Sequence, residues 1–215
     1  MRYDCRTLAD RDQGIAAAAE AVKSGQLVVL PTGTMYGLGA NAFDADAVAE
    51  LRRVKGHGRE VAAPVFVGSQ QTLDGLVLSL PQAARELVEA FWPGELSVVV
   101  EHAPSLAWDA GDSDGTFLVR MPLHPVALEL LRETGPMVVV AAGAAGQPAP
   151  RTAAEAAEQL GSAVSVYLEA GPCGEPTPST IVDCAEDPPQ LLRAGALLPD
   201  TLRTVVPDLV DETAE

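Results

Sequence analysis

Hydroxyl side chains and glycines gather in one short run of the sequence, Pro31 to Gly39. Thr32 and Thr34 place two hydroxyls on alternate residues, and the glycines of the run let a ligand approach the backbone closely. Such a turn can present N–H groups and hydroxyls to an anionic or zwitterionic ligand. A structural turn in which the threonines bond their own backbone would have the same composition, so both interpretations stay open.

Cationic side chains cluster in a second run, Lys55 to Arg59, in which a histidine stands between two glycines. The preceding residues predict a helix that Gly56 terminates, so these cations lie at a helix C-terminus. Flexible glycines on either side of His57 would let several donors converge on one phosphate group. The alternative is that Lys55 and Arg59 only satisfy the last carbonyls and the dipole of the helix.

Two further arginines stand among apolar residues, where a charge needs a partner. Arg120 ends a run of three apolar residues, and Arg193 follows two leucines. The partner is either a ligand or one of the 30 acidic residues of the chain. Ser179 and Thr180 add hydroxyls at a predicted strand start, although an ordinary turn also uses such residues.

Neither metal nor disulfide chemistry is indicated. Cys5, Cys173 and Cys184 are odd in number, far apart and without CxxC spacing. His102 and His124 also lack metal-ligand spacing, and we expect them at the surface or as helix caps. The sequence therefore predicts no permanently bound metal.

The compartment follows from the cysteines and from the distribution of apolar residues. Unpaired cysteines indicate a reducing environment. The first twelve residues are rich in charge and lack the apolar core of a signal peptide. No apolar run reaches the roughly 20 residues that span a membrane. We expect a cytoplasmic protein without a membrane partner.

The formal net charge of −16 at pH 7 bears on the choice of partners. A strongly negative protein repels phosphate backbones unless it carries a local basic patch. The 14 lysines and arginines are scattered along the chain, and no such patch is visible. Nucleic acid is therefore not an expected partner, and the sequence leaves the oligomeric state open.

Alternating helices and strands must position the candidate side chains. Apolar residues at helical spacing, with capping residues at the ends, predict helices over 14–23, 44–55, 81–91, 125–134, 152–160 and 199–206. Short apolar runs predict strands over 27–30, 64–67, 96–100, 116–120, 137–142, 165–168, 180–183 and 190–193. This alternation predicts an α/β fold with helices packed on a mixed, partly parallel sheet.

The domain organisation is predicted from length and composition. The chain has 215 residues, of which 47% are hydrophobic and 20% charged, so it has ample apolar surface to bury. No compositional seam divides it. We expect a single domain over residues 1–207 and a frayed acidic tail over residues 208–215.

Six short motifs follow one another along the chain. They are PTGTMYGLG at 31–39, Lys55-Gly56, Trp92-Pro93-Gly94, VRMPLHP at 119–125, STIVD at 179–183 and LRAG at 192–195. Each motif alone is a weak signal. The ordered set, which covers about residues 12 to 206, resembles the threonylcarbamoyl-AMP synthase (YrdC/Sua5) family in its short, single-domain form, whose signature is PTxTxYGLG.

The resemblance implies a twisted open sheet around a large concave cavity. There a nucleotidyltransferase joins threonine, bicarbonate and ATP, with magnesium, into threonylcarbamoyl-AMP and pyrophosphate for the t6A modification of tRNA. It assigns residues to the two substrates and to catalysis. Threonine would be held by Thr32, Thr34, Arg120 and Ser179, and the nucleotide by Lys55, Thr116 and Arg193. Lys55, Arg59 and Arg120 would be catalytic, acting through positioning and charge stabilisation.

The sequence departs from the family pattern on the nucleotide side. The KxR motif falls on residues 55–57, so its arginine is replaced by His57, which cannot form the same fork of donors. The SxN motif falls on residues 141–143, where Ala141 and Gly143 lack the polar groups. Each lost donor to a charged group is worth about 1.5–3 kcal/mol, and a lost transition-state donor costs about 10²–10³ in rate.

Three hypotheses follow from these matches and departures. The first is a synthase, weakened or altered in substrate, in which Arg59 partly replaces the missing arginine. The second is a repurposed or non-catalytic paralogue that binds a threonine-like or carbamoyl-adenylate ligand. The third is a double-stranded RNA-binding module, and the net charge of −16 counts against it.

Overall fold

The computed structural model describes residues 1–106, 108, 111, 114–174, 177–211 and 213. Its helices are α1 (Leu8–Lys23), α2 (Ala45–Lys55), α3 (Gln70–Asp74), α4 (Gln82–Phe91), α5 (Pro125–Thr134), α6 (Ala153–Leu160), the 3-10 turn η1 (Gly161–Ala163) and α7 (Pro199–Arg203). Its strands are β1 (Arg2–Asp4), β2 (Val28–Pro31), β3 (Tyr36–Asn41), β4 (Val65–Phe66), β5 (Leu96–Glu101), β6 (Thr116–Arg120), β7 (Met137–Ala141), β8 (Val166–Glu169), β9 (Thr180–Asp183), β10 (Gln190–Arg193) and β11 (Val210–Asp211).

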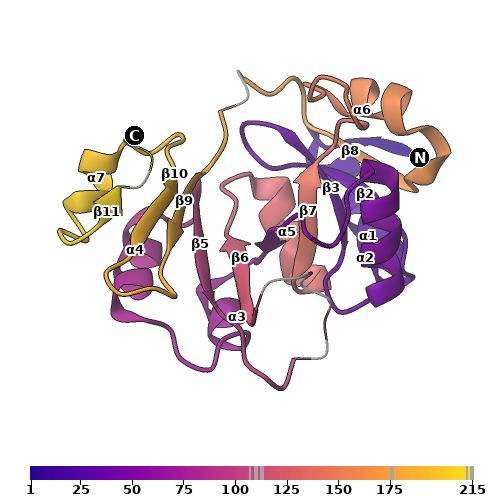
Figure 1. Ribbon diagram of the computed structural model, residues 1–215. Coiled ribbons are helices and arrows are strands. Elements are labelled where there is room, and N and C mark those ends of the chain that lie inside the picture. Colours follow the sequence, from indigo (N-terminus) through magenta and orange to yellow (C-terminus); the bar gives the residue numbers. More distant parts are fainter. Residues whose placement is uncertain (107, 109–110, 112–113, 175–176, 212, 214–215) are drawn as a thin grey trace.

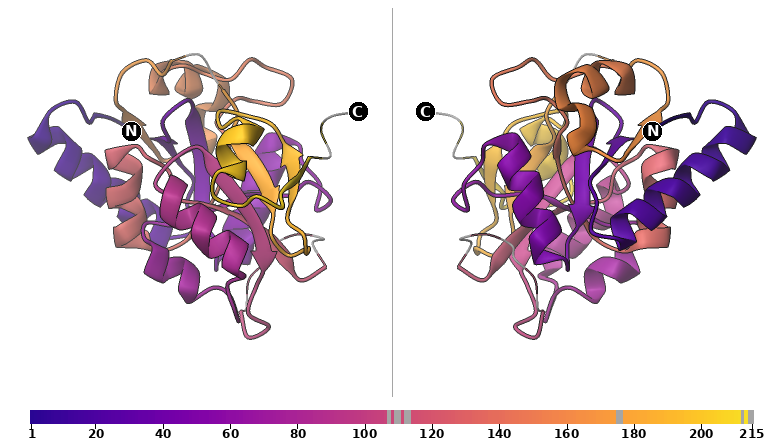
Figure 2. Two further views of the ribbon diagram at one scale, coloured as in Figure 1. Left: turned by 90° about the vertical axis from the view of Figure 1, so that its left-hand side faces the viewer. Right: turned by 90° about the vertical axis from the view of Figure 1, so that its right-hand side faces the viewer.

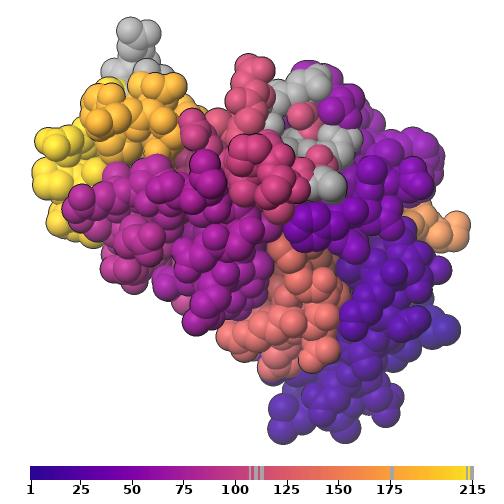
Figure 3. All heavy atoms as spheres, turned by 90° about the horizontal axis from the view of Figure 1, so that it is seen from below, coloured from indigo at the N-terminus to yellow at the C-terminus, as the bar shows by residue number. Residues whose placement is uncertain are grey.

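All strands of the described residues join one twisted open sheet, in the order β1-β8-β2-β3-β7-β4-β6-β5-β9-β10-β11 (Figure 1). The sheet is mixed. β2 pairs with β8 and β5 with β9 in parallel, whereas β3 pairs with β2 and β7 antiparallel. The predicted α/β class and mixed sheet are confirmed. The N-terminal and C-terminal elements occupy opposite ends of the molecule (Figure 3), as expected when β1 and β11 form the two edges.

Helices cover the two faces of the sheet unequally. Helices α2, α4 and α6 pack on one face and α1 and α5 on the other, so α1 and α2 lie on opposite sides of the sheet (Figure 2). Helices α1 and α5 contact β2, and α1 also contacts β1 and β8. Along each strand, side chains alternate between the two faces. The part of the second face that extends toward β9 and β10 carries the cavity described below.

Local signals in the sequence explain where most elements begin and end. The Asp44 side chain accepts a hydrogen bond from the Ala47 N–H at the start of α2, and Gly56 ends that helix in the left-handed conformation. Thr152 caps α6, but its partner Glu155 accepts from the N–H of Arg151 rather than of Thr152. β6, β9 and β10 coincide with the predicted strands.

Three strands and one helix were not predicted, and β3 is the most informative of them. It begins inside the PTGTMYGLG run, so this run forms a hairpin between β2 and β3 rather than a turn alone. Gly37 and Gly39 lie within β3, where a Cβ atom would stand 2.5 Å from Val139 and 2.7 Å from Met137 of the neighbouring strand β7. These two glycines serve close strand packing rather than a turn.

The end of the chain corrects the expectation of a frayed tail for part of its length. Leu209 is 4% exposed and belongs to the main core. Val210 and Asp211 form β11, which pairs in parallel with β10, and Asp211 lies 3.8 Å from Arg203. Leu209 to Asp211 are therefore folded. The tail residues 212, 214 and 215 lie outside the described part of the chain.

None of the helices in the described ranges is both long and apolar enough to cross a membrane.

Candidate functional site

A cavity of about 350 Å³ opens on the face of the sheet that α1 and α5 leave uncovered. It is lined by residues from the β2–β3 hairpin, the segment before β4, and strands β4, β5, β6, β7, β9 and β10. Its lining residues are Thr32, Met35, Gly37, Ala62, Pro64, Phe66, Ser97, Leu118, Arg120, Val139, Val140, Ala141, Pro178, Ser179, Ile181 and Arg193. This mixture of apolar walls and few polar groups is typical of small-molecule sites.

Five of the residues singled out in the sequence meet in this cavity: Thr32, Arg120, Ala141, Ser179 and Arg193. They come from points up to 161 residues apart in the chain. The sheet brings them together because β6, β5, β9 and β10 are neighbours in that order. The motifs that are separate in the sequence therefore form one site.

Ser179 is the centre of a polar cluster at the β9 end of the cavity. The Arg193 guanidinium donates to the Ser179 backbone oxygen at 2.9 Å and to its hydroxyl at 3.0 Å. The Ser97 hydroxyl lies 2.9 Å from the Ser179 hydroxyl. Gly195 permits this arrangement, because a Cβ there would stand 2.4 Å from the Pro178 oxygen. Ser97 was not singled out in the sequence, where it is one polar residue within an apolar strand.

Arg120 lines the cavity and contacts the Trp92-Pro93-Gly94 motif. Its Nε donates to the Gly94 oxygen at 2.9 Å, and its Nη2 lies 2.5 Å from a carboxylate oxygen of Glu95. The guanidinium carbon stands 5.5 Å from the centre of the Phe66 ring, which permits a cation–π contact. The sequence left two kinds of partner open for Arg120, a ligand or an acidic residue, and Glu95 is such an acidic residue.

Burial dominates the electrostatics of this pair. It raises the pKa of Glu95, against the attraction of Arg120, and it lowers the pKa of Arg120. Both shifts have the same physical cause, the removal of a charged group from water. Arg193 lies close enough to Arg120 to lower its pKa further.

The two threonines of the first motif have different surroundings. The Thr32 hydroxyl donates to the Met35 oxygen at 2.8 Å across the hairpin turn while the residue lines the cavity. Thr34 lies outside the lining and donates to the Thr177 oxygen at 3.1 Å, and its hydroxyl also reaches the Glu95 carboxylate. The tyrosine of the motif is structural, since the Tyr36 hydroxyl lies 2.6 Å from the Gly171 oxygen.

Lys55 stands beside the cavity rather than in its lining. Its ammonium group donates to the Gly143 oxygen, in the segment that follows Ala141 of the lining. Burial lowers the pKa of Lys55. The lysine thus links the end of α2 to the segment after β7, instead of satisfying the carbonyls of its own helix. His57 and Arg59 follow in the loop beyond α2, outside the cavity lining.

Thr116 begins β6, on the same face as Leu118 and Arg120 by strand alternation. It is not among the lining residues, and its register partner is Glu101 at the far end of β5. Six predicted site residues thus lie outside the lining: Thr34, Lys55, His57, Arg59, Thr116 and Gly143. Among them, Lys55 bonds Gly143, and Thr34 bonds Thr177, which precedes the lining residue Pro178.

Cationic side chains line the cavity, although the protein as a whole is strongly acidic, and the Glu95 carboxylate just outside the lining pairs with one of them, Arg120. The described lining residues include two arginines and no carboxylate. Such a lining suits an anionic or zwitterionic ligand. Within the described residues, no three His, Cys, Asp or Glu side chains gather closely enough to hold a metal ion.

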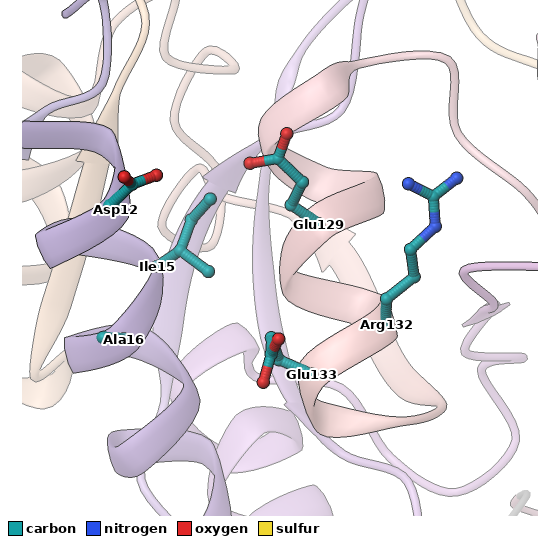
Figure 4. Close-up of a pocket in the computed structure, with 6 residues that line it drawn as sticks. All are labelled: Asp12, Ile15, Ala16, Glu129, Arg132 and Glu133. Carbon is teal, nitrogen blue, oxygen red and sulfur yellow. The ribbon is translucent and has the colours of Figure 1, made fainter. Parts of the chain in front are cut away.

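A second hollow of about 390 Å³ lies between α1 and α5 (Figure 4). It is lined by Asp12, Ile15, Ala16, Glu129, Arg132 and Glu133. None of these residues belongs to the six motifs. The polar groups of the motifs therefore converge on the cavity of the sheet and not on this groove.

Comparison with known protein families identifies the chain. Residues 20–195 match the Sua5/YciO/YrdC family, which carries the description "Telomere recombination". The chain belongs to the Sua5/YciO/YrdC family.

Curated relatives of this Sua5/YciO/YrdC chain carry one activity in their names. A Mycobacterium tuberculosis protein named "Putative threonylcarbamoyl-AMP synthase" is 52% identical over 204 residues, which are 95% of this chain and 94% of the relative. The threonylcarbamoyl-AMP synthase of Bacillus subtilis is 34% identical over 93% of this chain. The chain spans only 58% of that relative's length.

Solved structures of the family show the same fold. Sua5 of Pyrococcus abyssi, crystallised with L-threonine, superposes with a TM-score of 0.88 at 30% identity and covers all of this chain, which spans 63% of that protein. Escherichia coli YciO superposes with a TM-score of 0.80 at 21% identity over 94% of this chain and 97% of its own. The predicted YrdC-like fold is thereby confirmed.

Proposed function

We propose that the chain is a threonylcarbamoyl-AMP synthase, which converts threonine, bicarbonate and ATP into threonylcarbamoyl-AMP and pyrophosphate for the t6A modification of tRNA. The observation that carries the proposal is the convergence of Arg120, Ser179 and Arg193 on one cavity in a chain of this family. The names of the relatives support the synthase over a repurposed binding paralogue or a double-stranded RNA-binding module.

Threonine is assigned to the end of the cavity that Arg120 and Ser179 form. The planar guanidinium of Arg120 matches a carboxylate, and the Ser179 hydroxyl can donate to it. Thr34 borders this end, and Thr32 lines it. The Sua5 structure of the P. abyssi protein contains L-threonine, which supports the assignment of an amino acid to this fold.

The nucleotide is assigned to two contacts, Lys55 beside the cavity and Arg193 next to Ser179 of the threonine end. Lys55 reaches the segment after β7, and Arg193 lines the cavity from β10. Together with Thr116 and Arg59 they are the proposed phosphate and nucleoside contacts. His57, Ala141 and Gly143 occupy positions where a synthase of the usual pattern has polar donors, so we expect weaker ATP binding or slower turnover.

The chemistry requires positioning rather than a protein nucleophile. The threonine nitrogen adds to the bicarbonate carbon and water leaves, which gives a carbamate. A carbamate oxygen then attacks the α-phosphorus of ATP, and cleavage of the bond to the β-phosphate bridge releases pyrophosphate. Cationic side chains stabilise charge on the transferring phosphorus group, and holding the reactants together lowers the entropic cost. This is the catalytic role proposed for Lys55, Arg59 and Arg120.

Magnesium enters the proposal only as the ion that accompanies ATP. Within the described residues, no group of three His, Cys, Asp or Glu side chains would hold such an ion without the nucleotide. We propose a cytoplasmic location, where these substrates and tRNA occur, and small molecules rather than nucleic acid as the direct ligands.

The test is release of pyrophosphate by the purified chain with threonine, bicarbonate and ATP. We expect release that depends on all three substrates, with threonylcarbamoyl-AMP detected by mass spectrometry. Omission of threonine or bicarbonate is the internal control for ordinary ATP hydrolysis. A flat trace beside an active family member, measured on the same day, would overturn the proposal.

A further inference from the structure

Glu95 is a carboxylate placed against the arginine that we assign to the substrate carboxylate. It directly follows the Trp92-Pro93-Gly94 motif and is the last residue before β5. Its Oε2 atom lies 2.5 Å from Nη2 of Arg120. The neighbouring Nε of Arg120 is already bonded to the Gly94 oxygen. The side of the guanidinium that carries Nη2 is therefore occupied by an acid of the protein itself.

The same carboxylate also contacts the first motif. The Thr34 hydroxyl reaches Glu95 as well as the Thr177 oxygen, and its single proton can serve only one of them at a time. Gly33 makes room for this approach, since a Cβ there would stand 3.1 Å from Glu95 Oε1. Two of the four residues assigned to threonine, Thr34 and Arg120, thus contact Glu95.

The hydrogen bonding of the pair is incomplete. Arg120 Nη2 and Glu95 Oε2 are both buried, and within the described residues each has the other as its ion-pair partner and no further hydrogen bond. A buried charged donor without a full set of partners is costly and favours any ligand that completes it. A substrate carboxylate in the cavity would be such a ligand.

We propose that Glu95 is a built-in competitor of the substrate carboxylate: it occupies Arg120 in the empty site and turns away when an amino acid binds. This inference rests on the proposed function, because it takes threonine as the ligand of Arg120. It assigns to Glu95 a role in setting the affinity of the site for amino-acid carboxylates.

The different exposures of the two side chains determine which one moves. The Arg120 side chain is 5% exposed and is held by Gly94 and Phe66, whereas the Glu95 side chain is 19% exposed. Glu95 lies at the end of a loop and can rotate toward water. Arg120 would have to leave the sheet. Exchange of one carboxylate for another keeps the buried arginine paired throughout.

The test compares Glu95→Gln with the wild-type chain. Glutamine keeps the shape of the side chain but removes the charge that competes for Arg120. Glu101→Gln is the matched control, because it is the same substitution at the exposed far end of β5. Two probes are titrated by calorimetry: L-threonine, and L-threoninamide, which lacks the carboxylate.

We expect Glu95→Gln to bind threonine roughly tenfold more tightly, the size of one hydrogen bond to a charged group. Its affinity for threoninamide should stay unchanged, and Glu101→Gln should match the wild type with both probes. Unchanged or weaker threonine binding by Glu95→Gln would overturn the inference and would assign Glu95 to holding Arg120 in place. If no variant binds threonine and none releases pyrophosphate, the proposed function itself fails.

A measurement on the wild-type chain covers the case in which Glu95→Gln does not fold. A crystal structure with L-threonine should place the ligand carboxylate on Arg120 and the Glu95 side chain away from it. Retention of the Glu95 contact with Arg120 alongside bound threonine would contradict the proposal.

Discussion

Arg120 illustrates how a single residue is fixed before any ligand arrives. Its Nε bonds the Gly94 oxygen, its Nη2 pairs with Glu95, and its plane lies near the Phe66 ring. From the sequence, an arginine among apolar residues had to find either an acid or a ligand. The structure contains the acid, and the cavity places a ligand within reach of the same guanidinium.

Replacement of Arg120 by lysine tests this geometry. Lysine carries a point charge in place of the planar fork, so it cannot reproduce the fixed geometry in which Arg120 bonds Gly94 and a carboxylate together. We expect the KM for threonine to rise about 10- to 100-fold, equivalent to about 1.5–3 kcal/mol, while the KM for ATP changes little. Arg53→Lys is the control, because Arg53 forms an exposed pair with Glu50. A normal threonine KM with a lower kcat would remove Arg120 from the threonine site.

The replaced donors on the nucleotide side can be restored together, by His57→Arg, Ala141→Ser and Gly143→Asn. The surroundings of two of the three positions are known. Ala141 faces the cavity, and a Cβ at Gly143 would stand 3.2 Å from the Pro148 oxygen, which calls for only a small shift. The bond from Lys55 uses the backbone oxygen of Gly143 and survives the change.

Pyrophosphate release by this triple variant, followed at varied ATP, should rise by at least about tenfold and at most about 10²–10³-fold. His102→Arg supplies a control for added positive charge outside the cavity. The absence of any gain would show that the cavity has been rebuilt for a different ligand.

Single elements explain which features the sequence could predict. Some helix ends were predictable because their signals are local, as for Asp44 and Gly56 at the two ends of α2. The start of α1 was predicted at residue 14 but lies at Leu8, where the Thr7 side chain accepts from the Asp10 N–H. Strand β3 was not predictable, because the reason for its glycines is the close approach of side chains from β7, which the sequence does not show. The partnership of Arg120 with Glu95 was likewise invisible, since nothing within the sequence distinguishes Glu95 from the other acidic residues until β5 and β6 are paired.

His124 caps α5 and gives this helix a dependence on pH. Its Nδ1 accepts from the Val126 N–H at 3.3 Å, which requires a neutral ring. Burial, with Arg11 nearby, lowers the pKa of His124 below its ordinary value near 6.5. The unfolded chain therefore takes up the proton first. The contribution of this cap to the free energy of unfolding is fully present above about pH 6.5. It is lost as the pH drops from there through the lower pKa of the folded state.

His124→Asn should reduce this loss, because an asparagine oxygen caps a helix without titrating in this range. Urea denaturation between about pH 7 and pH 5 should show a smaller decline than in the wild type, by no more than the roughly 0.5–2 kcal/mol of a cap. His102→Asn leaves the cap intact and should show the same decline of the unfolding free energy with falling pH as the wild type. If the free energy of unfolding declines equally with falling pH in all three proteins, the His124 cap does not cause the loss of stability in acid.

One continuous sheet runs through the described part of the molecule from β1 to β11, so the domain extends at least to the last strand. The sequence placed the boundary at residue 207 because half of the eight residues that follow are acidic. In the structure, Leu209 packs into the same core as the helices α2 and α4, and β11 adds an edge to the sheet next to β10. Arg193, a lining residue of the cavity, belongs to β10. The folded end of the chain therefore supports a strand of the site.

Truncation tests this larger boundary. A chain that stops after Pro207 loses the buried Leu209 side chain, worth about 1.5–3 kcal/mol, and the pairing of β11 with β10. We expect its Tm to fall by roughly 3–12 °C in calorimetry, and its synthase activity to fall with it because β10 carries Arg193. A chain that stops after Asp211 keeps both features and is the matched control. Equal melting temperatures for the two truncated chains would return the boundary to residue 207, since β11 would then contribute nothing that the rest of the sheet needs.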